Sequence, residues 1–97
     1  MIRHIALLTL RPDTTDEQRQ HILDGLATLP AEIPALVDYR FGPDLGLAEG
    51  NATIAVVADC DDVAGYEAYR DHPAHVAVIA ERIRPVLASR AAAQFEI

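Results

Sequence analysis

The chain has 97 residues, of which 51% are hydrophobic and 24% charged, and its formal net charge at pH 7 is −7. Its eight basic residues are all arginines scattered along the chain, which argues against nucleic-acid binding because that function needs a clustered basic surface. A single cysteine cannot form an intramolecular disulfide, and no stretch approaches the roughly 20 apolar residues of a membrane span. We therefore expect one cytoplasmic domain, residues 1–97, without membrane contact.

Residues 1–10 are predicted to form a strand with two apolar faces. Alternation places His4 and Leu8 on one face and Ile5 and Leu7 on the other. A strand that is apolar on both sides is expected to be covered on both sides.

An amphipathic helix of about four turns follows. Thr14-x-x-Glu17 fits a capping box at its start, and Pro30 is expected to end it. Apolar residues recur at helical spacing between these two points, namely Ile22, Leu26 and Leu29.

Two strands are predicted next, over residues 36–41 and 52–58. The glycine-rich segment 42–51 connects them as a loop. The second strand is again apolar on both faces, with Ile54 and Val56 on one of them.

The last third of the chain is predicted to hold a broken helix and a final strand. Asp61 or Asp62 caps a helix that ends at His72, because the residue before a proline is pushed out of helical geometry. A new helix is expected from Pro73 to about Pro85, followed by a strand over residues 91–97. The residues expected to point inward from this helix and the turn after it are Val76, Ile79, Ala80, Ile83 and Leu87.

This order of elements is that of the α+β ferredoxin-like fold. Helices on one face of a four-stranded sheet leave the other face bare, and here both faces are apolar. We therefore predict a homodimer in which two such sheets pack face to face.

Three segments carry a resemblance to a known family. They are the opening strand from His4 to Pro12, the turn Leu29-Pro30-x-x-Ile33-Pro34, and the segment Tyr69-x-x-His72-Pro73-Ala74-His75-Val76. In these segments and in their spacing the chain resembles the stress-responsive dimeric α/β-barrel (Dabb) family over nearly its whole length. The resemblance implies a dimeric α/β barrel that encloses a cavity in each subunit.

The resemblance also implies a candidate chemistry. A plant branch of the family cyclises linear polyketides by aldol condensation, with a histidine as base and a tyrosine that assists. The matching positions are His75 and Tyr69, and a first-strand histidine of that branch matches His4. A further histidine on the third strand of that branch falls at Ile54, which is a departure from the pattern.

The histidines have structural alternatives. His72 is expected to cap the helix that starts at Pro73, and His75 either acts as a general base near neutral pH or hydrogen-bonds a neighbouring loop. His4 either lines the cavity or makes a structural hydrogen bond. We expect the face of the first strand that carries His4 to point into the barrel, where the ligand-binding residues would be His4, Phe41, Ile54 and Val56.

Metal binding has little support, because His72-x-x-His75 with the adjacent Asp71 is a weak ligand set. We predict neither a metal nor a cofactor. Two functions remain open. One is a homodimeric, stress-associated protein that binds a small hydrophobic molecule in the barrel cavity. The other is a cyclase-like enzyme with His75 as general base and Tyr69 as hydrogen-bond donor.

Overall fold

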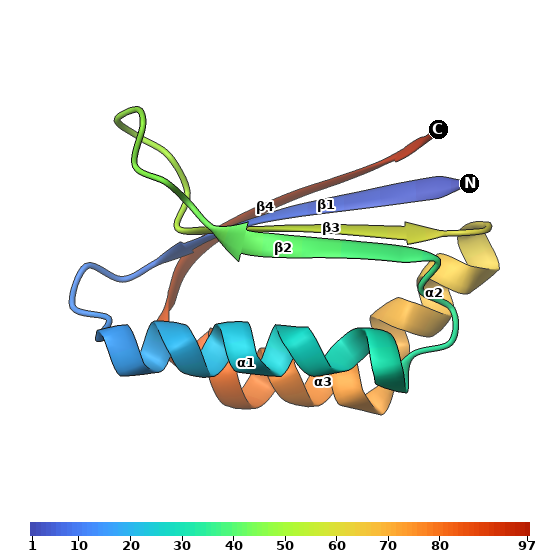
Figure 1. The fold of residues 1–97 in the computed structure, drawn as a ribbon, viewed down its shortest axis with the longest axis horizontal. Coiled ribbons are helices and arrows are strands. Elements are labelled where there is room, and N and C mark those ends of the chain that lie inside the picture. The colour runs from blue at the N-terminus through green and yellow to red at the C-terminus, as the bar shows by residue number, and fades with distance from the viewer.

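The computed structural model describes residues 1–97 as a four-stranded antiparallel sheet with the helices on one of its faces (Figure 1). The predicted order of strand, helix, two strands, broken helix and strand is confirmed. The elements are β1 (Ile2–Leu10), α1 (Asp16–Glu32), β2 (Asp38–Pro43), β3 (Ile54–Cys60), α2 (Val63–Asp71), α3 (Pro73–Val78), a π-helical turn (Ile79–Ile83), a 3-10 turn (Arg84–Val86) and β4 (Leu87–Glu96). No helix is long and apolar enough to cross a membrane.

The sheet has the strand order β2-β3-β1-β4, so β1 and β3 lie at its centre. Residues that are directly opposite on neighbouring strands share a face. His4 is opposite Ala58 on β3 and Gln94 on β4, and Leu8 is opposite Ile54 and Arg90. These side chains therefore all belong to one face of the sheet, which is the face that the helices cover.

Helix α1 packs its apolar stripe on this face, with Ile22, Leu26 and Leu29 buried. Its start and end differ from the prediction. Thr15, and not Thr14, is the N-cap: its hydroxyl accepts from the Gln18 amide, and the Gln18 side chain accepts from the Thr15 amide in return. The helix also continues through Pro30 to Glu32. Pro30 lies in the last turn, where the loss of one backbone hydrogen bond is tolerated and the next turn still closes.

The broken helix is confirmed at its predicted position. Asp62 caps α2 by accepting from the Gly65 amide at 2.7 Å. His72 lies between α2 and α3, and its Nδ1 accepts from the Ala74 amide at 3.1 Å, so the predicted capping role of His72 is confirmed. Pro73 occupies the first turn of α3, where its missing N–H costs nothing.

The predicted inward face of the second half of the helix is partly wrong. Val76 is 50% exposed and Ala80 is exposed as well, whereas Val78, Ile83 and Val86 are buried. Val76 was expected to point inward because it is hydrophobic. Instead, the neighbouring His75 occupies the inward position and contacts the ring of Tyr69. The π-helical turn also shifts the helical phase, because it holds more residues per turn than an α-helix.

The sheet face opposite the helices is uncovered within the chain (Figure 1). It is apolar over β1, β3 and β4, with Leu7 42% and Phe95 47% exposed. The loop between β2 and β3 rises from the sheet on the side away from the helices, and its Leu45 and Leu47 are more than 80% exposed. We call this surface the open face.

Candidate functional site

The helix-covered side of the sheet contains a small cavity of about 40 Å³. It lies between β1, β3 and β4 above and the helical segments below, and eight of its eleven lining residues are hydrophobic. Its polar groups come from four residues, namely His4, Tyr69, His75 and Arg90. The cavity thus combines an apolar lining with a few convergent polar side chains, which is the usual character of a small-molecule site.

The helix break at His72-Pro73 positions two of these groups. Tyr69 lies in the last turn of α2 and His75 in the first turn of α3. Because the chain changes direction between them, the two rings face each other with their centroids 4.4 Å apart. The local sequence that ends one helix and starts the next therefore builds this pair.

His75 is held by the backbone of the preceding helix. Its Nδ1 lies 2.9 Å from the carbonyl oxygen of Arg70, to which it donates. The proton is thus on Nδ1, and Nε2 keeps its lone pair. Burial lowers the pKa of His75 below the ordinary value of 6.5, so the neutral imidazole prevails at neutral pH.

His4 is held in the opposite way. The side-chain amide of Gln94 on β4 donates to Nδ1 of His4 at 2.8 Å, which places the proton of the neutral ring on Nε2. His4 is only 4% exposed, and desolvation, followed by the nearby charges of Arg90 and His75, lowers its pKa from 6.5 to about 4. Near neutral pH, His4 therefore offers a donor, whereas His75 offers an acceptor.

Tyr69 completes the set between the two histidines. Its ring centroid lies 6.0 Å from that of His4, and the residue is 2% exposed. Burial raises the pKa of Tyr69 well above its ordinary value of 10, so its hydroxyl stays protonated and remains a hydrogen-bond donor. One base and two donors around one cavity suit proton removal next to a carbonyl group whose oxygen gains negative charge.

The predicted site residues divide into two groups. His4, Val56, Tyr69 and His75 line the cavity together, whereas Phe41 and Ile54 do not. All four residues predicted to bind a ligand, His4, Phe41, Ile54 and Val56, lie on the helix-covered face and not on the open face that was expected to carry them. Both faces of β1 are apolar, so alternation alone did not show which of them receives the helices.

Two polar residues of the site were missed in the sequence. Arg90 and Gln94 are four residues apart on β4, so they point to the same face, toward the cavity side. The prediction for this segment followed the opposite row of residues, which is more apolar, and started the strand four residues too late. The signal that could have identified them is that two polar residues, Arg90 and Gln94, stand an even number of residues apart in the strand.

A much larger hollow lies elsewhere in the molecule. It measures about 530 Å³ and lies between the β2–β3 loop and the open face, lined by Leu7, Leu45 and Leu47 among others. Its only ionisable side chain is Asp44. It is therefore a large surface depression with one carboxylate and no base beside it, and we assign the candidate chemistry to the smaller cavity.

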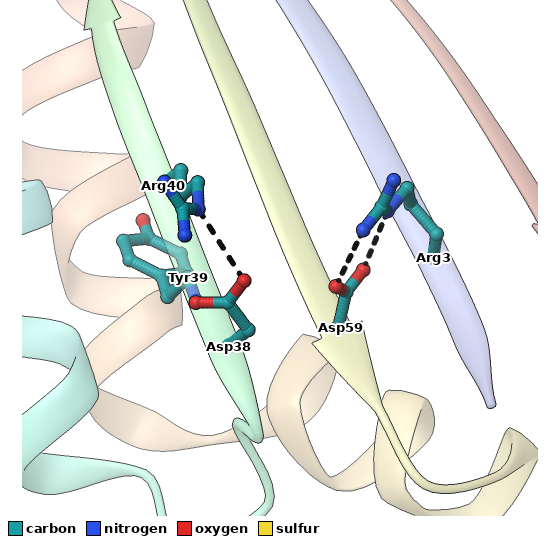
Figure 2. Close-up of polar contacts among 5 residues, drawn as sticks. All are labelled: Arg3, Asp38, Tyr39, Arg40 and Asp59. Carbon is teal, nitrogen blue, oxygen red and sulfur yellow. Dashed lines mark hydrogen bonds and ion pairs between the residues drawn. The ribbon is translucent and has the colours of Figure 1, made fainter. Parts of the chain in front are cut away.

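The open face carries its charges at one end and along β2 (Figure 2). Arg3 on β1 binds Asp59 on β3 through two hydrogen bonds of 2.9 Å, and this pairing lowers the pKa of Asp59. Arg40 lies 3.4 Å from Asp38 on β2. These ion pairs border the apolar part of the open face rather than interrupting it.

No group of three or more histidine, cysteine or carboxylate side chains lies close enough to hold a metal ion. The two residues of the His72-x-x-His75 motif do not converge, because each directs Nδ1 at a different backbone group.

Comparison with known proteins agrees with this architecture. Several solved structures with the same ferredoxin-like fold are described as dimeric. A dimeric ferredoxin-like protein of unknown function from Thermobifida fusca YX is 50% identical, with a TM-score of 0.91 over 99% of this chain and 90% of that chain. The chain belongs to the stress responsive A/B barrel domain family, whose sequence model matches residues 2–97. The predicted family and fold are thus confirmed.

More distant structures share the fold. A dimeric protein of unknown function from Bacteroides fragilis NCTC 9343 is 26% identical, with a TM-score of 0.87 over 99% of this chain and 95% of that chain. A hydroxynitrile lyase from Passiflora edulis is 19% identical, with a TM-score of 0.84 over 99% of this chain and 92% of that chain. No protein of curated function matches this chain significantly in sequence.

Proposed function

We propose that this protein binds a small, mainly apolar carbonyl compound in the cavity of His4, Tyr69 and His75, and that His75 removes a proton from it. The observation that carries the proposal is that hydrogen bonds hold the two histidines in opposite tautomers. Arg70 holds the proton of His75 on Nδ1, and Gln94 leaves the proton of His4 on Nε2. A site that only needed to fill space would not require one acceptor and two donors.

The proposed step is balanced as follows. Nε2 of His75 takes a proton from the carbon next to the carbonyl, the electron pair of that C–H bond forms a C=C bond, and the π pair of the carbonyl moves to its oxygen. The resulting enolate oxygen receives hydrogen bonds from the Tyr69 hydroxyl and from His4 Nε2–H. In an aldol cyclisation, the enolate carbon then attacks a second carbonyl of the same molecule, and the imidazolium of His75 returns its proton to the new alkoxide.

A ligand of this kind needs a larger space than the present cavity. Ligand pockets usually measure roughly 300–1,000 Å³, against about 40 Å³ here. The lining includes Ile79 and Ile83, both in the π-helical turn, a type of turn that often occurs at functional sites. Outward movement of this turn is the simplest route to a wider cavity. The apolar lining also favours a second candidate function, which is binding of a hydrophobic molecule without turnover.

The proposal includes a homodimer in the cytoplasm. The open face is expected to pack against the same face of a second copy, because it exposes Leu7 and Phe95 within a row of small apolar residues. The dimeric state described for the relatives supports this pairing. In a light-scattering measurement, the wild type should be a dimer and Leu7→Glu should shift it to monomers. A folded wild-type monomer at micromolar concentration would rule out the dimer.

The catalytic proposal is tested by deuterium uptake. The protein is incubated in D₂O with an aryl methyl ketone, and NMR follows the loss of the protons next to the carbonyl. His75→Gln and Tyr69→Phe should abolish the exchange above background, while their melting temperatures change little. His72→Ala is the matched control: it should cost about 1 kcal/mol of stability as a lost helix cap and leave the exchange intact.

Two results would count against this function. If ketones stabilise the protein against heat and no exchange occurs, the protein is a binder, and the second candidate function stands. If His75→Gln lowers the melting temperature as much as His72→Ala and exchange never exceeds background, the histidine is structural.

A further inference from the structure

The cavity has a cation at its mouth that no group of the chain neutralises. Arg90 lies on β4 directly opposite Leu8, on the helix-covered face, and lines the cavity with His4, Tyr69 and His75. The residue is exposed, so the guanidinium has access to solvent. Five other arginines have a carboxylate within 4.0 Å, and Arg90 has none; those five are Arg3, Arg11, Arg19, Arg40 and Arg70.

No carboxylate accompanies the positive charge of Arg90 in the lining of the cavity. The chain carries 15 acidic residues against eight basic ones, so a paired position would be easy to provide. Instead, the polar groups that face Arg90 across the cavity are two histidines and a tyrosine, none of which is negatively charged at neutral pH. Burial is the main reason that the pKa of both histidines is lowered, and the charge of Arg90 lowers it further.

We propose that Arg90 binds a carboxylate of the ligand, so that the substrate of the cavity is a keto acid with an apolar body. This inference rests on the proposed function of the same cavity and deepens it by naming the substrate class. The guanidinium presents a planar fork of N–H donors that matches a carboxylate in two parallel hydrogen bonds. Because Arg90 is at the open side of the cavity, the carboxylate stays near solvent while the apolar part enters.

This arrangement also sets the direction of the ligand. The carboxylate lies at β4, and the carbonyl group reaches inward to Tyr69 and to Nε2–H of His4. A bound anion beside Arg90 offsets the field of the guanidinium at the histidines. The pKa of His75 then rises, which makes its Nε2 a stronger base. Binding of the acid and activation of the base are thus coupled through Arg90.

The experiment compares a free acid with its ester. 3-Benzoylpropionate and its methyl ester share the same aryl ketone and differ in the negative charge and one methyl group. Binding is measured by calorimetry on the wild-type protein, on Arg90→Gln and on Arg84→Gln. Arg84 is the matched control, since it is an exposed arginine outside the cavity and also lacks an ion pair. A third probe, a phosphate monoester of an aryl alcohol, tests whether the anchor prefers another anion.

We expect the wild type and Arg84→Gln to bind the acid about tenfold more tightly than the ester, the range of a charge-assisted bidentate contact. Arg90→Gln should bind both equally, at the affinity of the ester. Equal binding of acid and ester by the wild type would overturn the carboxylate anchor and leave the proposed function standing. Tighter binding of the phosphate monoester than of the acid would replace the keto acid by a phosphorylated substrate.

Two further outcomes are distinguishable. If neither acid nor ester binds to the wild type, the proposed function fails and the anchor fails with it. If Arg90→Gln weakens the dimer in light scattering while the ratio of acid to ester binding is unchanged, Arg90 belongs to a subunit contact, and the inference is wrong.

Discussion

Acidification below about pH 6.5 should destabilise this protein through His4. Folding lowers the pKa of His4 from 6.5 to about 4, mainly by desolvation and further by Arg90 and His75. Between these two pH values the unfolded chain binds a proton at His4 that the folded chain excludes. The contribution of neutral His4 to the free energy of unfolding is fully present above about pH 6.5, and it is lost as the pH falls from 6.5 toward 4.

The magnitude follows from the gap between the two pKa values. At ~1.4 kcal/mol for each pH unit, a fall from 6.5 to about 4 amounts to about 3 kcal/mol for His4. His75 contributes in the same direction, since burial lowers its pKa as well. Asp59 acts separately: Arg3 lowers its pKa below the ordinary 3.8, so its contribution is lost only at more acidic pH.

Urea unfolding followed by far-ultraviolet circular dichroism measures this loss. The free energy of unfolding is determined from pH 7.5 to pH 4.5 at one protein concentration, because dissociation of a dimer would otherwise add to it. The wild type should lose stability steadily below pH 6.5. The His4→Gln variant keeps a hydrogen-bonding side chain without a titrating ring. Its loss of stability on acidification should therefore shrink to the part that is due to His75. A wild-type curve that stays flat to pH 4.5, or an equal slope in both proteins, would refute the reasoning.

Three further predictions concern stability. A methyl group on Gly25 would lie 2.5 Å from Cδ of Arg82. Gly25→Ala should therefore gain the usual ~1 kcal/mol of helix propensity only in an Arg82→Ala background. Equal effects in both backgrounds, measured by thermal unfolding, would be evidence against this contact. Thr15→Ala should cost about 1 kcal/mol of stability, because it removes the helix cap. Thr14→Val should cost nothing, because the buried Thr14 hydroxyl has no hydrogen-bond partner. Chemical unfolding of the two variants distinguishes the two positions. Tyr39→Phe removes another buried hydroxyl without a partner, so its midpoint should stay equal or rise, and a clear fall would reveal a hydrogen bond absent from this structure.

Much of the candidate site was predictable because it depends on short segments. The His72-Pro73 step breaks the helix through local sterics, and that break is what brings Tyr69 and His75 together. The sequence singled out Tyr69 and His75 together, and the structure places their rings 4.4 Å apart. Arg90 and Gln94 were not, because they reach the site from a strand about 90 residues away from His4, through pairing that no local pattern specifies.

The exact helix boundaries were predicted less well, and the reason is again physical. Two adjacent threonines are equivalent as caps by residue type, and the structure uses Thr15, which pairs with Gln18 in a capping box. Helix α1 continues past Pro30, because only one hydrogen bond is lost in the final turn.

By itself, the sequence determined the order of the elements, the position of the helix break, the capping of α2 and α3 and the family. These features arise from backbone sterics and hydrogen bonds within a few residues. Only the tertiary structure decided which face of β1 receives the helices, and with it that His4 and Val56 lie on the helix-covered face and not on the open face. Both faces are apolar, so each satisfies the hydrophobic effect equally well, and the choice depends on the pairing of strands far apart in the chain.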